Sequence, residues 1–91
     1  MKVVINSCFG GFGLSAQAAA LVKARGGPTE ESMDIGYRTH PVLVAVVEEL
    51  GKAASSRYGN LTVVDVPDDV EVEIDEYAGL EEVEEVHRRW S

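Results

Sequence analysis

The N-terminal segment of this chain constrains its fold more than any other part. The β-branched residues Val3, Val4 and Ile5 follow one another and run into a glycine-rich stretch that ends at Ser15. Successive side chains of a strand point to opposite faces, so an unbroken apolar run predicts a strand that is buried on both faces. Ser15 is a preferred residue at a helix N-cap. We therefore expect a central strand, a tight loop and a helix start within the first 16 residues.

The rest of the sequence predicts an α+β domain. Gly26-Gly27-Pro28 ends an alanine-rich helix, Pro41 suits the first turn of a second helix, and residues 29–39 show no period and read as a loop. The predicted helices cover residues 16–25, 41–58 and 80–90, and the predicted strands cover residues 3–5, 61–66 and 70–75. The expected order is β-α-α-β-β-α, with helices packed on a three-stranded mixed sheet.

The length of 91 residues predicts a single domain that covers residues 1–91. A chain this short has a modest core, so association with a second copy would help it and we expect a homo-oligomer. No apolar run is long enough for a signal peptide or a transmembrane span, so we expect no membrane contact. One cysteine cannot form an internal disulfide, which is typical of a cytoplasmic protein.

Negative charge is concentrated near the C-terminus. The formal net charge is −8, and residues 65–85 carry eleven acidic side chains and no lysine or arginine. Such a surface repels phosphate backbones, so direct nucleic-acid binding is not expected. Two interpretations remain open, a solvated face and an acidic surface that binds a basic protein in place of nucleic acid. The candidate partner-binding residues of the second interpretation are Glu71, Glu73, Glu81 and Glu82.

The glycine-rich loop is the candidate ligand site. It lacks the Lys-Ser/Thr ending of a P-loop and the glycine spacing of a dinucleotide fingerprint. Exposed backbone N–H groups at a helix start would still favour an anion, and aromatic side chains would stack on a base. The candidate ligand-binding residues are Cys8, Phe9, Gly10, Gly11, Phe12, Gly13, Ser15 and Tyr77. The alternative is a tight strand-to-helix turn whose phenylalanines only fill the core.

Other chemistry is less favoured by the sequence. A nucleophilic Cys8 would need a base, and the only histidines are His40, which suits a helix cap, and His87 in the last predicted helix. The neighbouring acidic residues lack the convergent spacing of a calcium loop. We therefore expect no catalytic residues, no metal site and no cofactor, and keep an enzyme with Cys8 as nucleophile as a weaker alternative.

The chain resembles a widespread family of small tailed-phage proteins. The shared motifs are Cys-(Phe/Tyr)-Gly-Gly-Phe-x-Leu-Ser at residues 8–15, Pro-x-Leu-Val-x-Val-Val-Glu-x-Leu-Gly at 41–51, Pro-Asp-Asp-Val at 67–70, Ile-x-Glu-Tyr-x-Gly-(Leu/Met)-Glu-x-Val at 74–83 and a closing His-Arg-x-Trp. The resemblance covers most of the chain except residues 29–39. Several relatives carry aromatic residues where this chain has Val72 and Glu82.

The resemblance implies a non-enzymatic phage accessory protein in the host cytoplasm. Together with the loop, it leads to our first hypothesis, that the protein sequesters a phosphate-bearing (cyclic) nucleotide immune signal and so counters host defence. The second hypothesis is an acidic inhibitor that binds a host CRISPR or other nuclease complex.

Overall fold

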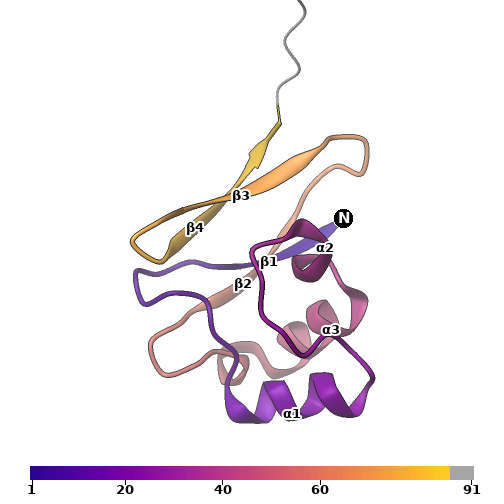
Figure 1. Cartoon of the computed structure of the whole chain (residues 1–91), viewed down its shortest axis with the longest axis vertical. Helices are drawn as coiled ribbons and strands as arrows, with labels where there is room; N and C mark the ends of the chain where they lie inside the picture. Colours follow the sequence, from indigo (N-terminus) through magenta and orange to yellow (C-terminus); the bar gives the residue numbers. More distant parts are fainter. Residues whose placement is uncertain (87–91) are drawn as a thin grey trace, which may run out of the picture.

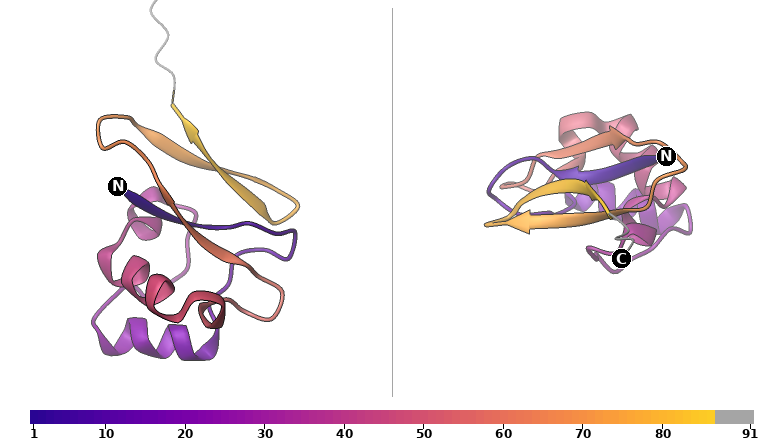
Figure 2. Two further views of the ribbon diagram at one scale, coloured as in Figure 1. Left: turned by 180° about the vertical axis from the view of Figure 1, so that it is seen from behind. Right: turned by 90° about the horizontal axis from the view of Figure 1, so that it is seen from above.

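Residues 1–86 are described by the computed structural model, and they form an α+β fold (Figure 1). The elements in chain order are β1 (Lys2–Asn6), α1 (Ala16–Ala24), α2 (Ile35–Arg38), α3 (Pro41–Leu50), the 3₁₀ helix η1 (Gly51–Ala54), β2 (Leu61–Asp65), β3 (Val72–Tyr77) and β4 (Leu80–Glu85). The helices lie on one side of the β1–β2 ribbon and the β3–β4 hairpin lies on the other (Figures 1 and 2).

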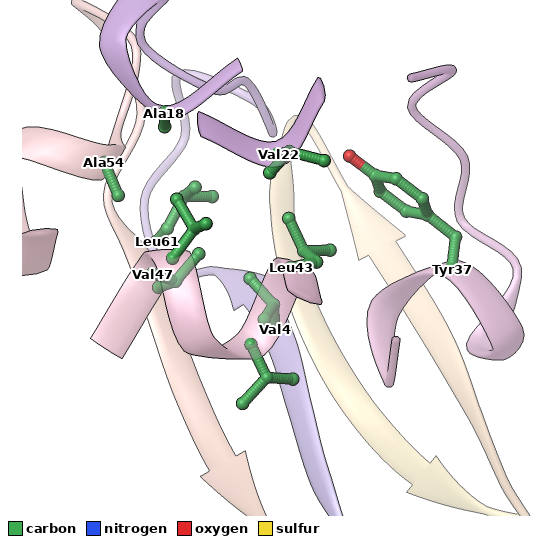
Figure 3. Packing of buried hydrophobic residues seen from close by; sticks show 10 residues of the cluster. Val4, Ala18, Val22, Tyr37, Leu43, Val47, Ala54 and Leu61 are labelled. Carbon is green, nitrogen blue, oxygen red and sulfur yellow. The ribbon is translucent and has the colours of Figure 1, made fainter. Parts of the chain in front are cut away.

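The main core lies between β1–β2 and the helices (Figure 3). Val4 faces the helices together with Leu61 of β2, while α1 contributes Val22 and α3 contributes Leu43 and other apolar residues. Val3 is also fully buried but lies outside this cluster. Alternate residues of a strand point to opposite faces, so Val3 lies on the hairpin side. The prediction that β1 is buried on both faces is confirmed.

The strands form two separate antiparallel ribbons, and the predicted three-stranded mixed sheet is not formed. β1 pairs with β2, and β3 pairs with β4. On the other edge of β1, side chains form hydrogen bonds with the backbone groups. Arg38 Nη1 donates to the Val4 carbonyl at 3.2 Å, and Glu81 Oε1 accepts from the Asn6 N–H at 2.8 Å. Because these groups are already bonded, the hairpin contacts β1 without extending its hydrogen-bond ladder.

A buried ion pair joins the hairpin to the helical part of the molecule. The Arg38 guanidinium binds both carboxylate oxygens of Glu81, at 2.6 and 2.8 Å. Arg38 is 1% exposed and Glu81 is 4% exposed. The pair therefore links α2, β1 and β4, three elements far apart in the sequence.

The prediction of a final helix after Gly79 is wrong, because Leu80–Glu85 is strand β4. The spacing of Leu80, Val83 and Val86 is helical, but a two-residue turn reverses the chain before them. Ala78 and Gly79 in that turn both have positive φ, 51° and 94°, as a hairpin turn of type I′ requires. Trp90 and His87 of the predicted helix lie outside the described residues.

The other helices follow the sequence closely at their N-termini. Ser15 caps α1 by accepting from the Ala18 N–H, and α3 begins at Pro41 as predicted. The second predicted helix is too long, because α3 ends at Leu50 and the chain continues as η1. The predicted loop contains one helical turn, α2, which Asp34 caps through its carboxylate.

Candidate functional site

The Asn6 side chain forms hydrogen bonds to three turns at one corner of the molecule. Its side-chain Nδ2 donates to the Cys8 and Gly79 carbonyls, each at 2.7 Å, and its Oδ1 accepts from the Asn60 N–H at 2.8 Å. The loop after β1, the loop before β2 and the hairpin turn therefore all meet at this fully buried amide. Figures 1 and 2 both show the three turns at the same side of the molecule. Reasoning from the sequence missed Asn6, whose signal is a polar residue that ends an otherwise apolar strand.

The glycines allow the three backbones to touch. A Cβ atom on Gly79 would lie 2.6 Å from the Phe9 carbonyl oxygen, and one on Gly10 would overlap the Tyr58 carbonyl. Any larger residue at these two positions would separate the turns. The corner is thus a closely packed backbone junction, from which the neighbouring side chains project.

Three of those side chains are exposed aromatic rings, one from each turn. Phe9 is 64% exposed, Tyr58 is 70% exposed and Tyr77 is 77% exposed. They account for most of the large hydrophobic side chains that residues 1–86 leave in solvent. The sequence predicted Phe9 and Tyr77 as ligand-binding residues, and the structure brings their turns together. Tyr58 was not predicted.

Arg57 adds a positive charge to this corner. Its guanidinium carbon lies 5.6 Å from the centre of the Tyr58 ring, which is within the range of a cation–π contact. The salt bridges among the described residues do not include Arg57. The sequence offered no way to place this arginine beside the glycine-rich loop. We call Phe9, Arg57, Tyr58 and Tyr77 the aromatic corner.

Cys8 lies beneath the aromatic corner. Its thiol donates to the Tyr58 carbonyl at 3.1 Å and lies 3.5 Å from Asn6 Oδ1. His40, one of the two candidate bases, accepts from the Val42 N–H and caps α3, as the sequence suggested. The other candidate, His87, lies outside the described residues. Within the described part of the chain, Cys8 therefore has carbonyl partners and no imidazole partner.

Phe12 is half-buried and packs against the core. The Arg38 guanidinium carbon lies 3.7 Å from the centre of the Phe12 ring, and Tyr37 packs edge-on against the same ring at 6.0 Å. Phe12 thus covers the buried ion pair, which corresponds to the alternative in which a phenylalanine of the loop fills the core. Burial and the nearby Glu31 carboxylate raise the pKa of Tyr37 to about 12.

The N–H groups of Leu14 and Ser15, just before α1, are bonded within the protein. Ser15 uses its hydroxyl to cap the helix and to bond the Ala53 carbonyl at 2.6 Å, and its N–H bonds the Ala54 carbonyl. The Glu31 carboxylate accepts from the Leu14 N–H at 3.1 Å. These bonds use the N–H groups of Leu14 and Ser15, and they hold Ser15 against η1 and not at the aromatic corner. Gly10 and Gly11 remain at the corner, and Gly13 contacts Ser56 of the neighbouring loop.

The acidic residues form the exposed surface of the β3–β4 hairpin. On one face, Glu73 lies opposite Glu84 and Asp75 lies opposite Glu82. Glu71 is exposed as well. Glu81 was predicted to belong to the same partner-binding surface, and this prediction is wrong, because its carboxylate is buried against Arg38. Alternate residues of a strand point to opposite faces, so one face of β4 points inward. The sequence did not indicate that Glu81 would lie on that face or that Arg38 would be its partner.

No group of three or more His, Cys, Asp or Glu side chains within residues 1–86 is placed to hold a metal ion. None of the helices described is long and apolar enough to span a membrane. Comparison with models of protein families, with curated proteins and with solved structures finds no match for this chain.

Proposed function

We propose that this protein binds a phosphate-bearing nucleotide at the aromatic corner. The observation that carries the proposal is that three turns, each with an exposed aromatic ring in it or next to it, meet at one backbone junction, with Arg57 beside the Tyr58 ring. Exposed aromatic rings are costly in water and are typical of surfaces that stack on bases, where each stacked base contributes ~1–3 kcal/mol. The guanidinium of Arg57 would bind phosphate oxygens by charge-assisted hydrogen bonds.

The proposed site differs from the sequence-based hypothesis in its phosphate contacts. The N–H groups of Leu14 and Ser15 are bonded to Glu31 and Ala54, so Arg57 replaces the helix start as the anion-binding group in this proposal. Phe9 and Tyr77 keep their proposed roles as base-stacking residues, and Tyr58 joins them. Asn6 holds the three turns in place and does not contact the ligand.

The biological role follows from the resemblance to tailed-phage proteins. A small phage protein that binds nucleotides without transforming them would sequester a cyclic nucleotide immune signal in the host cytoplasm. In this proposal the protein is not an enzyme, and its effect depends on the number of copies relative to the signal.

Isothermal titration calorimetry with a panel of cyclic and linear nucleotides tests the proposal. We expect binding of at least one of them, at least tenfold weaker in the Arg57→Gln and Tyr58→Ala variants. Lys23→Gln is the matched control, because this exposed cation lies on α1, away from the corner. The absence of heat with every nucleotide, or equal affinity in wild type and the two corner variants, would refute the proposal.

The acidic hairpin supports a second candidate function, binding to a basic host defence protein. The specific observation is the like-charge pairing of Glu73 with Glu84 and Asp75 with Glu82. Like charges directly opposite one another destabilise a ribbon, and a cationic partner would remove that penalty. Charge reversal at Glu71, Glu73 and Glu82 would abolish inhibition of such a partner and leave nucleotide binding unchanged. Inhibition that survives the reversal would exclude this candidate.

A further inference from the structure

Strand β2 has an outer edge that no other strand pairs with in the described part of the chain. Its even-numbered residues bond to β1, as the flanking bonds Val66 N–H to Met1 O and Ser7 N–H to Asn60 O show. In an antiparallel ladder the intervening residues direct their N–H and C=O groups to the other edge. These residues are Leu61, Val63 and Asp65. The Leu61 N–H is taken by the Ser55 hydroxyl at 2.8 Å, and the Val63 groups have no hydrogen-bond partner within residues 1–86.

The two ribbons differ in how they protect their free edges. β4 is the hairpin strand that contacts β1, so β3 carries the outer edge of the hairpin. That strand contains three carboxylates, and charged residues on an edge oppose pairing with another strand. β2 contains no charged residue from Leu61 to Val64, and no proline. Of these two edges, only the edge of β2 lacks a row of charged residues that would oppose pairing with another strand.

From this contrast we infer that β2 pairs with β2 of a second copy, antiparallel and centred on Val63. A two-fold axis at Val63 would align its N–H and C=O with the same groups of the partner. It would also align each Asp65 N–H with the Leu61 carbonyl of the other copy. The four resulting bonds use the groups that the monomer leaves free and spare the Leu61 N–H, which Ser55 already binds. The edge is therefore complementary to itself.

Side chains on the outer face fit the same register. Thr62 would lie opposite Val64 of the second copy, and both residues are at least partly exposed in the monomer. Cross-strand pairs of β-branched residues favour strand association. The hairpin contacts β1 and leaves β2 accessible on this face. The result is a four-stranded sheet across the dimer, with the helices of both copies on one side.

Val63→Pro tests the inference directly, because proline removes an N–H that points away from β1 and is tolerated on an edge strand in that orientation. Val63→Ala is the matched control, because it shortens the side chain and keeps the N–H. Sedimentation velocity over a range of concentrations should give a dimer for the wild type and for Val63→Ala. The Val63→Pro variant should sediment as a monomer with an unchanged circular dichroism spectrum. A monomeric wild type, or a folded Val63→Pro variant that remains dimeric, would overturn the inference.

A crosslinking experiment covers the case in which the proline variant does not fold. Thr62→Cys and Val64→Cys are prepared separately in a Cys8→Ser background and then mixed and oxidised. We expect the mixture to give several-fold more disulfide-linked dimer than either variant alone, because residue 62 of one copy faces residue 64 of the other. Equal yields in the mixture and the separate samples would overturn the proposed register.

Discussion

The buried ion pair between Arg38 and Glu81 should be the main anchor of the hairpin, and Glu81→Gln tests this. The substitution keeps the side-chain shape and an oxygen that can accept from the Asn6 N–H. It removes the negative charge that faces a guanidinium only 1% exposed. Breaking a buried ion pair on one side costs about 3–5 kcal/mol, because the remaining charge is left without compensation.

That loss would be a large part of the total stability. A domain of this length has a free energy of unfolding of about 5–14 kcal/mol. With a urea dependence of about 1–3 kcal/mol per molar, the unfolding midpoint should fall by at least ~1 M. Urea titration followed by circular dichroism measures the shift directly.

Glu82→Gln is the matched control, one residue away on the opposite face of β4. Glu82 is exposed and lies opposite Asp75, so its neutralisation should change stability by no more than about 0.5 kcal/mol and should not be destabilising. If Glu81→Gln unfolds within ~1 kcal/mol of the wild type, the ion pair is not the anchor and our description of the hairpin attachment is wrong.

Three further predictions concern single residues. Asn6→Asp should destabilise the protein by at least ~2 kcal/mol in urea titration, because two donors to the Cys8 and Gly79 carbonyls are lost; wild-type stability would show that Asn6 does not join the turns. Gly79→Ala should be more destabilising than Gly26→Ala in thermal unfolding, because both glycines have positive φ but only Gly79 faces backbone atoms below 3 Å; equal effects would contradict the close packing. The free energy of unfolding should fall from about pH 10 to pH 12, because folding raises the pKa of Tyr37 to about 12. In this range Tyr37 ionises in the unfolded state while it stays neutral in the folded state, which favours unfolding. Tyr37→Phe should lose this contribution and be neutral or stabilising at pH 7, since the hydroxyl is buried without a partner in the described structure; an unchanged pH profile would refute the assignment.

The parts of the fold predicted correctly from the sequence depend on local signals. The apolar run of β1, the Ser15 cap and Pro41 at the start of α3 each act within a few residues of their own position. Strand β2 was predicted from the alternation of Leu61 and Val63 with Thr62 and Val64, whereas its pairing with β1 in a separate ribbon was not.

The errors arose where distant residues decide the structure. Leu80, Val83 and Val86 have helical spacing, yet Glu81 must face inward to reach Arg38, which lies 43 residues earlier. The same pair bonds Val4 and Asn6 on the edge of β1, so the third strand of the expected sheet has no free groups there. No local pattern contains this information.

Only part of the candidate site could be predicted, because its geometry also depends on residues that are distant in the sequence. Phe9 and Tyr77 could be identified as aromatic residues in or next to turns, but the contact between those turns depends on Asn6 and on the close backbone approach at Gly79. The position of Arg57 depends on the loop before β2, and no sequence pattern indicates that this loop lies beside the glycine-rich loop. The helix start, in contrast, was a correct local prediction, and the N–H groups of Leu14 and Ser15 just before it are bonded by Glu31 and Ala54.

A nucleotide titration followed by ¹H–¹⁵N NMR tests the central claim most directly, because it locates the contact as well as detecting it. With the nucleotide that binds in calorimetry, we predict the largest shift changes in the amides of residues 8–11, 57–59 and 77–79. Small changes are expected at residues 14–18 and in the acidic positions of β3. Changes centred on the start of α1, or no changes at saturating nucleotide, would contradict the account.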